Sequence, residues 1–229
     1  MRLVITGCEY AGKTTLLKQI TEWWSEKTGI RFDHLIGHDH FTFYGGGSQM
    51  RPPPGMSDVP PEELEKVKAL GPVVKEQLQR YMIEYHLGMR WTEFPDWIMV
   101  GFHIEEAVYA PLYYGYGYPN QYGDREFFAR HVDHLIMQHF PGTVLVLVKA
   151  SPETIAKRMR ETPHSDNTIK EKDIELLLER FNEEYNKSIL YPKFILDTTD
   201  KTPEETLNEF VELMSPHLSQ YDLLRMVRR

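Results

Sequence analysis

The deciding stretch of the sequence is Gly7-Cys8-Glu9-Tyr10-Ala11-Gly12-Lys13-Thr14-Thr15. It fits the phosphate-loop (Walker A) pattern, in which a glycine and four free positions precede Gly-Lys-Thr. Residues 2–6 before it read as a short buried strand, and Leu16, Leu17 and Ile20 after it recur at helical spacing. In such a loop, backbone N–H groups and the positive end of the following helix hold phosphate oxygens. Motif and context together predict that residues 7–15 bind a nucleoside triphosphate.

Individual side chains of this loop have expected tasks. Lys13 is predicted to reach the β- and γ-phosphates, and the Thr14 hydroxyl to hold Mg²⁺. ATP and Mg²⁺ are therefore the expected cofactors. Cys8 occupies a free position of the pattern, where a tolerated small residue is the simpler interpretation and a redox role is the alternative.

Composition narrows the class of protein. The chain has 229 residues, a net charge of −8 and one cysteine. One α/β domain is expected, and a single cysteine excludes an internal disulfide framework and fits a reducing cytoplasm. No apolar run approaches the ~20 residues needed to span a membrane, and no secretory signal is recognised, because the first strand leads straight into the loop. The negative charge argues against a broad nucleic-acid surface, although a local basic cluster can still bind a small anionic substrate.

Strands and helices alternate along the rest of the chain, which predicts a parallel sheet with right-handed crossovers. Expected strands cover residues 31–36, 97–104, 143–148 and 193–196, with Glu105 and Glu106 ending the second of these. Expected helices cover about 13–27, 60–90 with a break at Gly71-Pro72, 124–139, 152–161, 170–187 and a last one after Thr202. In the helix before residue 90, one apolar face carries Val74, Leu78, Tyr81, Met82 and Tyr85, and we interpret it as core. Residues 42–93 read as a loop plus a helical insertion near the acceptor site, within a single domain over residues 1–229.

In this order, the motifs resemble those of the thymidylate kinase and deoxynucleoside kinase group of P-loop kinases. The loop resembles the thymidylate kinase loop, with an acidic third position followed by Ala-Gly-Lys-Thr-Thr. Ala150-Ser151-Pro152-Glu153 and the basic run Lys157-Arg158-Met159-Arg160 are similar to that group's strand end, helix start and arginine-bearing lid. Residues 178–185 resemble the helix after the lid, and residues 195–205 resemble the last strand and helix. The resemblance implies a P-loop NTPase three-layer α/β/α sandwich with a central parallel sheet and a helical lid at about 157–170.

The sequence departs from that group at three places. Tyr10 stands where these kinases usually have glycine or another residue. Glu105-Glu106 replaces the group's Asp-Arg or Glu-Arg pair, so the expected arginine is missing. Residues 43–91 have no clear counterpart. These departures leave the acceptor undefined.

Phosphoryl transfer requires neutralisation of charge on the transferring group, and the lid arginines are candidates for that task. Arg158 and Arg160 are the predicted catalytic cations, with Arg180 as a third. Lys157 and Arg160 share one helix face and Arg158 points elsewhere. The alternative is an ordinary solvated helix end.

A kinase also needs a group that orients or deprotonates the acceptor hydroxyl. Asp39 is the candidate, because it follows a strand at the edge where open α/β sheets bind ligands, and a turn carboxylate is the alternative. His38, Asp39 and His40 also suggest a metal site, but no second ligand cluster has convincing spacing for zinc. The acceptor pocket is expected between Asp39, residues 105–113 and the helix around Tyr81.

Glu105 is the candidate second ligand of Mg²⁺, either directly or through water, and the alternative is an acid in the first turn of a helix. A tyrosine-rich segment follows, with Tyr109, Tyr113, Tyr114, Tyr116, Tyr118 and Tyr122. These rings could stack on a base, and the alternative is a packed loop or a contact between the subunits of a homodimer.

The sequence therefore predicts an ATP-dependent kinase for a small hydroxylated or phosphorylated acceptor, with a nucleoside or nucleotide favoured. Kinases for other hydroxylated metabolites use the same scaffold and remain an alternative. So does a P-loop NTPase or nucleotide-binding protein without a small-molecule acceptor.

Overall fold

The computed structural model describes residues 1–29, 36–38, 60–88, 92, 94–164 and 168–227. Its centre is a five-stranded sheet in the order β2-β3-β1-β4-β5, and all neighbouring strands run parallel. The strands are β1 (Arg2–Thr6), β2 (Ile36–His38), β3 (Trp97–Gly101), β4 (Val144–Lys149) and β5 (Lys193–Asp197). The predicted parallel sheet is confirmed.

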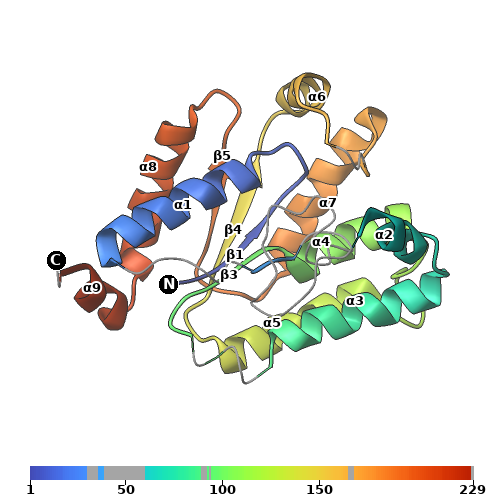
Figure 1. Cartoon of the computed structure of the whole chain (residues 1–229), viewed down its shortest axis with the longest axis horizontal. Helices are drawn as coiled ribbons and strands as arrows, with labels where there is room; N and C mark the ends of the chain where they lie inside the picture. The colour runs from blue at the N-terminus through green and yellow to red at the C-terminus, as the bar shows by residue number, and fades with distance from the viewer. Residues whose placement is uncertain (30–35, 39–59, 89–91, 93, 165–167, 228–229) are drawn as a thin grey trace.

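Helices cover both faces of the sheet (Figure 1). Helices α1 (Lys13–Thr28) and α8 (Pro203–Met214) pack together on one face. Helices α4 (Phe102–Tyr109), α5 (Arg125–His139) and α7 (Ile174–Lys187) cover the other, and α6 (Pro152–Glu161) follows β4. Short turns of π- and 3₁₀-helix lie at Ala110–Tyr114, Glu171–Asp173 and Ser215–His217. The predicted three-layer α/β/α sandwich is confirmed.

The layers follow from the sequence pattern. β4 reads Val-Leu-Val-Leu-Val-Lys and is buried along its length except at Lys149, as expected for a strand covered on both faces. Separate apolar clusters lie on either side of the sheet, one around Trp24 and Phe210 and the other around Trp97 and Phe181. Gly29 ends α1 in the left-handed conformation, and Thr202 with Glu205 forms a capping box at the start of α8.

The prediction that a strand runs to residue 104 is wrong. β3 ends at Gly101 and α4 begins at Phe102, so Glu105 and Glu106 lie on a helix. Every residue of α4 is buried, and an apolar run that is buried all round does not reveal by periodicity whether it is strand or helix. Gly101 and Phe102 both have positive φ, of 79° and 58°, which turns the chain sharply between the two elements.

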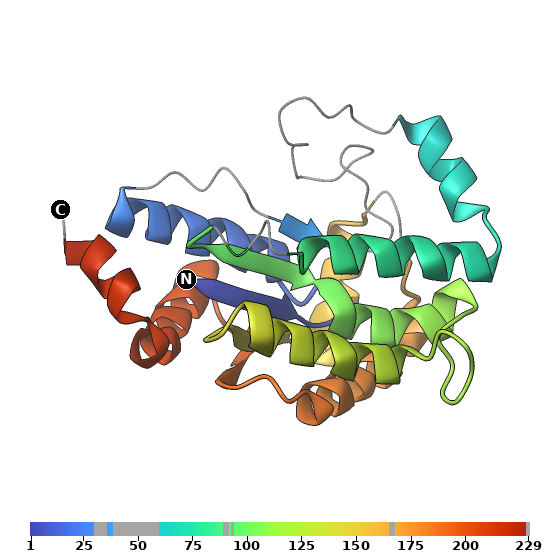
Figure 2. The ribbon, with the colours of Figure 1, turned by 90° about the horizontal axis from the view of Figure 1, so that it is seen from below.

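Helices α2 (Pro61–Lys68) and α3 (Pro72–His86) lie in the predicted insertion. The interpretation of the Val74–Tyr85 face of α3 as core is wrong, because Tyr81 and Tyr85 are 64% and 41% exposed. The buried face of α3 carries Glu76, Gln79, Ile83 and His86 instead. Of these, Glu76 accepts hydrogen bonds from a buried arginine of α5, Arg125, through its carboxylate and its backbone carbonyl oxygen. Figure 2 shows α3 running beside the α4 and α5 layer.

A C-terminal helix, α9 (Gln220–Val227), was not anticipated from the sequence. It packs on α1, and its Arg225 pairs with Asp96 just before β3, at 2.7 Å. The ion pair fixes α9 to the amino-terminal edge of the sheet, on the side opposite the phosphate loop.

Candidate nucleotide and phosphoryl-transfer site

The phosphate loop connects the carboxyl end of β1 to the first turn of α1. Gly7 has φ 141°, and a Cβ added there would lie 2.0 Å from the carbonyl oxygen of Val148, so only glycine fits. Gly12 has φ 99° and caps α1 without a side-chain hydrogen bond. The first amides of α1 therefore have no capping side chain from Gly12, as a phosphate-binding helix start requires. The backbone shape at Gly7 and Gly12 and the uncapped start of α1 are the features that a phosphate-binding loop requires.

Lys13 lies inside this loop. Its ammonium group donates hydrogen bonds to the carbonyl oxygens of Gly7 and Cys8 and pairs with Glu105 at 2.7 Å. The Lys13 and Glu105 side chains are 11% and 3% exposed. This pairing joins the first residue of α1 to the first turn of α4. The two helices begin close together because the strands that precede them, β1 and β3, are neighbours in the sheet.

Glu105 thus sits in the first turn of a helix and also faces the phosphate loop. The interpretation as an acid in the first turn of a helix describes its position, and its role as a ligand of Mg²⁺ stays a prediction. Thr14 is exposed at the start of α1. A hydroxyl and a carboxylate are suitable oxygen donors for Mg²⁺. Among the described residues, no group of three or more His, Cys, Asp and Glu side chains is arranged to hold a metal ion by itself.

The adjacent Glu106 points into a different environment. It accepts hydrogen bonds from Arg125 at 3.1 Å and from the Tyr116 hydroxyl at 2.9 Å. Arg125 is fully buried and also donates to Glu76 of α3. Glu106 occupies the position where the thymidylate kinase and deoxynucleoside kinase group has an arginine. Here it links α3, α4 and α5 within the core instead.

The candidate lid arginines occupy different places. Arg158 donates hydrogen bonds to the carbonyl oxygens of Tyr10 and Thr198 and to the Thr198 hydroxyl, at 2.8–3.1 Å. No carboxylate in the described part of the chain pairs with it. Burial lowers the pKa of Arg158, which remains cationic at neutral pH. Its guanidinium thus lies against the phosphate loop.

The other cations lie on the surface in this conformation. Arg160 pairs with Glu171 at 2.6 Å, and its side chain is 62% exposed. Arg180 pairs with Glu183 at 3.2 Å, also at the surface. The structure therefore brings Arg158, but neither Arg160 nor Arg180, to the phosphate loop, and a catalytic role for any of them stays a prediction.

Two residues that the sequence did not single out complete this region. Thr198 accepts from Arg158 and donates to the carbonyl oxygen of Ala11. It follows the end of β5, so the rule that polar residues after parallel strands meet at one edge could have found it. His164 contacts Tyr10, and no pattern in the sequence indicates this contact.

Cys8 is buried, and burial raises the pKa of its thiol to about 12. A protonated, buried thiol is a poor nucleophile, so the structure favours the tolerated-residue interpretation over a redox role. Tyr109 is fully buried, and its hydroxyl accepts a hydrogen bond from the Glu9 amide at 3.1 Å. Tyr109 and Tyr116 thus follow the packing alternative, whereas Tyr118 and Tyr122 are exposed.

Part of the expected acceptor pocket lies outside the described residues. Asp39 and His40 lie outside the described residues, and of His38 only the backbone is described. The role of Asp39 as a base and the metal site of His38, Asp39 and His40 therefore stay predictions. Residues 105–113 do lie at the carboxyl end of β3, beside the phosphate loop. Tyr81 is on the exposed face of α3.

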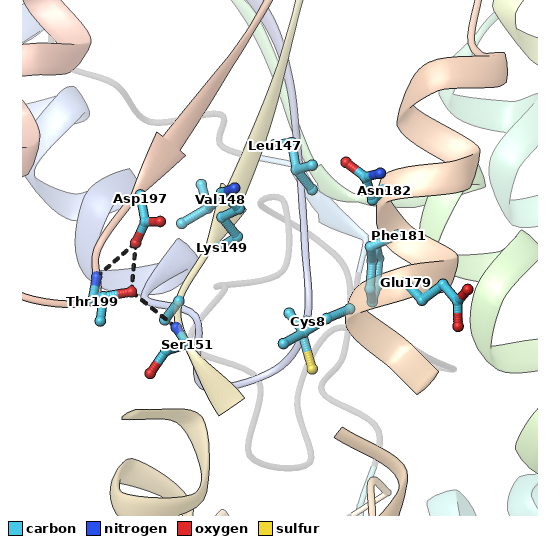
Figure 3. Close-up of a pocket in the computed structure, with 12 residues that line it drawn as sticks. Cys8, Leu147, Val148, Lys149, Ser151, Glu179, Phe181, Asn182, Asp197 and Thr199 are labelled. Atoms are coloured by element: carbon cyan, nitrogen blue, oxygen red, sulfur yellow. Dashed lines mark hydrogen bonds between the residues drawn. The ribbon is translucent and has the colours of Figure 1, made fainter. Parts of the chain in front are cut away.

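A cavity of about 370 Å³ adjoins the loop on its other side. Figure 3 shows Cys8 between β4 and α7, with Asp197, Thr199 and Ser151 across from the α7 residues Phe181 and Asn182. The Thr199 hydroxyl donates to Asp197 and accepts from the Ser151 amide. This cavity is bounded by β4, β5 and α7, so it differs from the acceptor pocket expected beside β2, β3 and α3.

No sequence model of a known protein family matches the chain. A protein of Pyrococcus furiosus, provisionally named an adenylate kinase, is 34% identical over 90 residues. The match covers 37% of this chain and 44% of that protein, so the chain spans less than half the length of the curated relative it matches.

Solved structures resemble the whole chain. The deoxyadenosine kinase from M. mycoides with bound dATP matches with a TM-score of 0.58 at 15% identity, over 94% of this chain and 100% of that one. A thymidylate kinase from Candida albicans matches with a TM-score of 0.51 at 12% identity, over 95% and 93%. The fold is that of the P-loop nucleoside and nucleotide kinases. The resemblance that the motifs indicated is confirmed at this level.

Proposed function

We propose that the protein is an ATP-dependent phosphotransferase that acts on a small hydroxylated or phosphorylated acceptor, a nucleoside or nucleotide. The observation that carries this proposal is the meeting of Lys13 and Glu105 inside the phosphate loop, at 2.7 Å, in a kinase fold. The P. furiosus relative, with its provisional kinase name, supports the same class of reaction.

The chain's own residues would divide the task as follows. The glycine-shaped loop and the start of α1 bind the phosphates through backbone amides. Lys13 would exchange the loop carbonyls for phosphate oxygens, and Thr14 and Glu105 would hold Mg²⁺, which would supply positive charge that neutralises the transferring group. Arg158 lies close enough to the loop to add a cation from the lid segment.

Acceptor binding is assigned to the β3 side of the loop, between α4 and the end of β2, with Asp39 as the base. Asp39 and most of its neighbours lie outside the described residues, so this part of the proposal rests on the topological rule for open sheets. No helix in the described part of the chain is long and apolar enough to cross a membrane. A cytoplasmic location and a homodimer stay predictions.

The test is a screen of nucleosides, nucleoside monophosphates and simple hydroxylated metabolites for acceptor-dependent release of ADP from ATP and Mg²⁺. Release that requires an acceptor supports the kinase. Release of the same rate without any acceptor supports an NTPase instead. Binding of ATP without release of ADP, in the presence of every acceptor class, supports a nucleotide-binding protein. The Lys13→Ala variant serves as the control for contaminating activity.

A further inference from the structure

Tyr10 is a residue of the phosphate loop whose side chain neither the fold nor the proposed reaction explains. It adopts a left-handed backbone with φ 61°, a conformation that favours glycine, and yet it carries a large aromatic ring. The ring is buried although the loop lies at the end of the sheet where the strands have their carboxyl ends. A conformational cost of this kind persists only where surrounding contacts enforce it.

Those contacts come from the lid segment. The His164 ring stacks on the Tyr10 ring, with centroids 4.2 Å apart and planes inclined by 22°. The His164 backbone amide donates a hydrogen bond to the Tyr10 hydroxyl at 3.0 Å. Glu9 places a carboxylate oxygen 3.8 Å from His164 Nδ1. His164 therefore covers two consecutive residues of the loop.

A second contact reaches Tyr10 from the preceding helix. Arg158 of α6 donates to the Tyr10 carbonyl oxygen at 3.1 Å, and its guanidinium lies about 4 Å from the position that a Cβ on Gly12 would take. The Thr162 hydroxyl donates to the Arg158 carbonyl oxygen and so ties the end of α6 to this arrangement. The backbone, the ring and the hydroxyl of Tyr10 thus each bind a different part of residues 158–164.

We propose that Tyr10 is a positioning residue. Through its contacts with His164 it holds residues 158–164 against the phosphate loop, an arrangement that we call the seat, and so keeps Arg158 beside the bound triphosphate. This inference rests on the proposed function for its effect on turnover, but the seat itself is a property of the protein without ligand. A seat formed in advance lowers the entropic cost of ordering the lid segment when nucleotide binds.

The first test needs no activity. Amide hydrogen exchange at His164 is measured in the full chain and in Tyr10→Phe, which keeps the ring and removes the hydroxyl acceptor. Faster exchange at His164 in this variant is expected, with no change in β1 or β4. Tyr191→Phe is the matched control, because Tyr191 is exposed. Unchanged exchange at His164 in Tyr10→Phe would overturn the proposal.

The second test measures turnover and ATP affinity. His164→Ala removes the stacked ring from a half-exposed position, so the variant is expected to fold. Loss of one aromatic pair should raise the KM for ATP by about 2- to 10-fold and lower kcat, and His164→Phe should restore both. His134→Ala, on the exposed surface of α5, is the control. Wild-type KM and kcat in His164→Ala, or no recovery in His164→Phe, would refute the positioning role.

The two proposals can fail separately. If the wild-type protein shows no acceptor-dependent turnover, the proposed function fails, and the Kd of ATP with Mg²⁺ measured by calorimetry replaces KM in the same variants. A Kd that rises in His164→Ala and recovers in His164→Phe then still supports the seat, and a Kd that does not move overturns it.

Discussion

Glu105→Gln tests the centre of the proposed site. The substitution keeps the shape of the side chain and removes the charge that lies 2.7 Å from the Lys13 ammonium. Lys13 retains the Gly7 and Cys8 carbonyl oxygens as acceptors. The loss of stability should therefore stay near the cost of one hydrogen bond to a charged group, about 1–3 kcal/mol, below the larger cost of a buried charge left without partners.

The effect on catalysis should be larger. If Glu105 helps to hold Mg²⁺, removal of its charge should raise the Mg²⁺ concentration needed for half-maximal rate by about 10- to 100-fold. Loss of one preorganised group at the developing charge lowers kcat by about 10²- to 10³-fold. The assay is acceptor-dependent ADP release across a Mg²⁺ titration, with the free energy of unfolding measured by urea denaturation.

Glu106→Gln is the matched control, because Glu106 is the next residue of α4 and is equally buried but faces Arg125. It should lower stability and leave the Mg²⁺ requirement unchanged. If Glu105→Gln folds and keeps its kcat and Mg²⁺ requirement within about threefold of wild type, well inside the loss expected for a metal-binding group, the proposed role of Glu105 is refuted.

Three further predictions follow from other residues. Lys13→Ala should weaken ATP binding and lower turnover by about 10²-fold or more, because it removes the cation that faces the phosphates; unchanged ATP binding by calorimetry would refute the loop assignment. Arg158→Ala should lower kcat more than Arg160→Ala, because Arg158 contacts the loop whereas Arg160 pairs with Glu171 at the surface; wild-type kcat in both variants would make the lid segment an ordinary solvated helix end. Burial lowers the pKa of His86 from 6.5 to about 4, so the unfolded chain binds the proton more tightly than the folded protein. Stability should therefore fall by about 3 kcal/mol as the pH drops from about 6.5 to about 4, and urea unfolding of His86→Asn should show a flatter dependence in this range.

The order of secondary structure could be predicted because each local signal has a local cause. The strand, the glycines and the helix start around Lys13 depend on residues within about one turn of each other, and so do the caps at Ser151 and Thr202. The parallel sheet follows from the alternation of these elements. Tertiary packing overrode local patterns at the junction of β3 with α4. It also did so on α3, where the buried Glu76 pairs with Arg125 from a distant part of the chain.

The sequence by itself determined the phosphate loop, the fold class and the candidates Lys13 and Glu105, because the chemistry of phosphate binding restricts residue types within a short segment. Only the tertiary structure decided that Glu105 faces Lys13 while Glu106 faces Arg125, since a turn of about 100° between neighbouring helix residues sends their side chains to different partners. It alone also placed Arg158 and His164 on Tyr10 and left Arg160 at the surface. Contacts between residues some 150 positions apart depend on how helices pack on the sheet, and no local pattern records that.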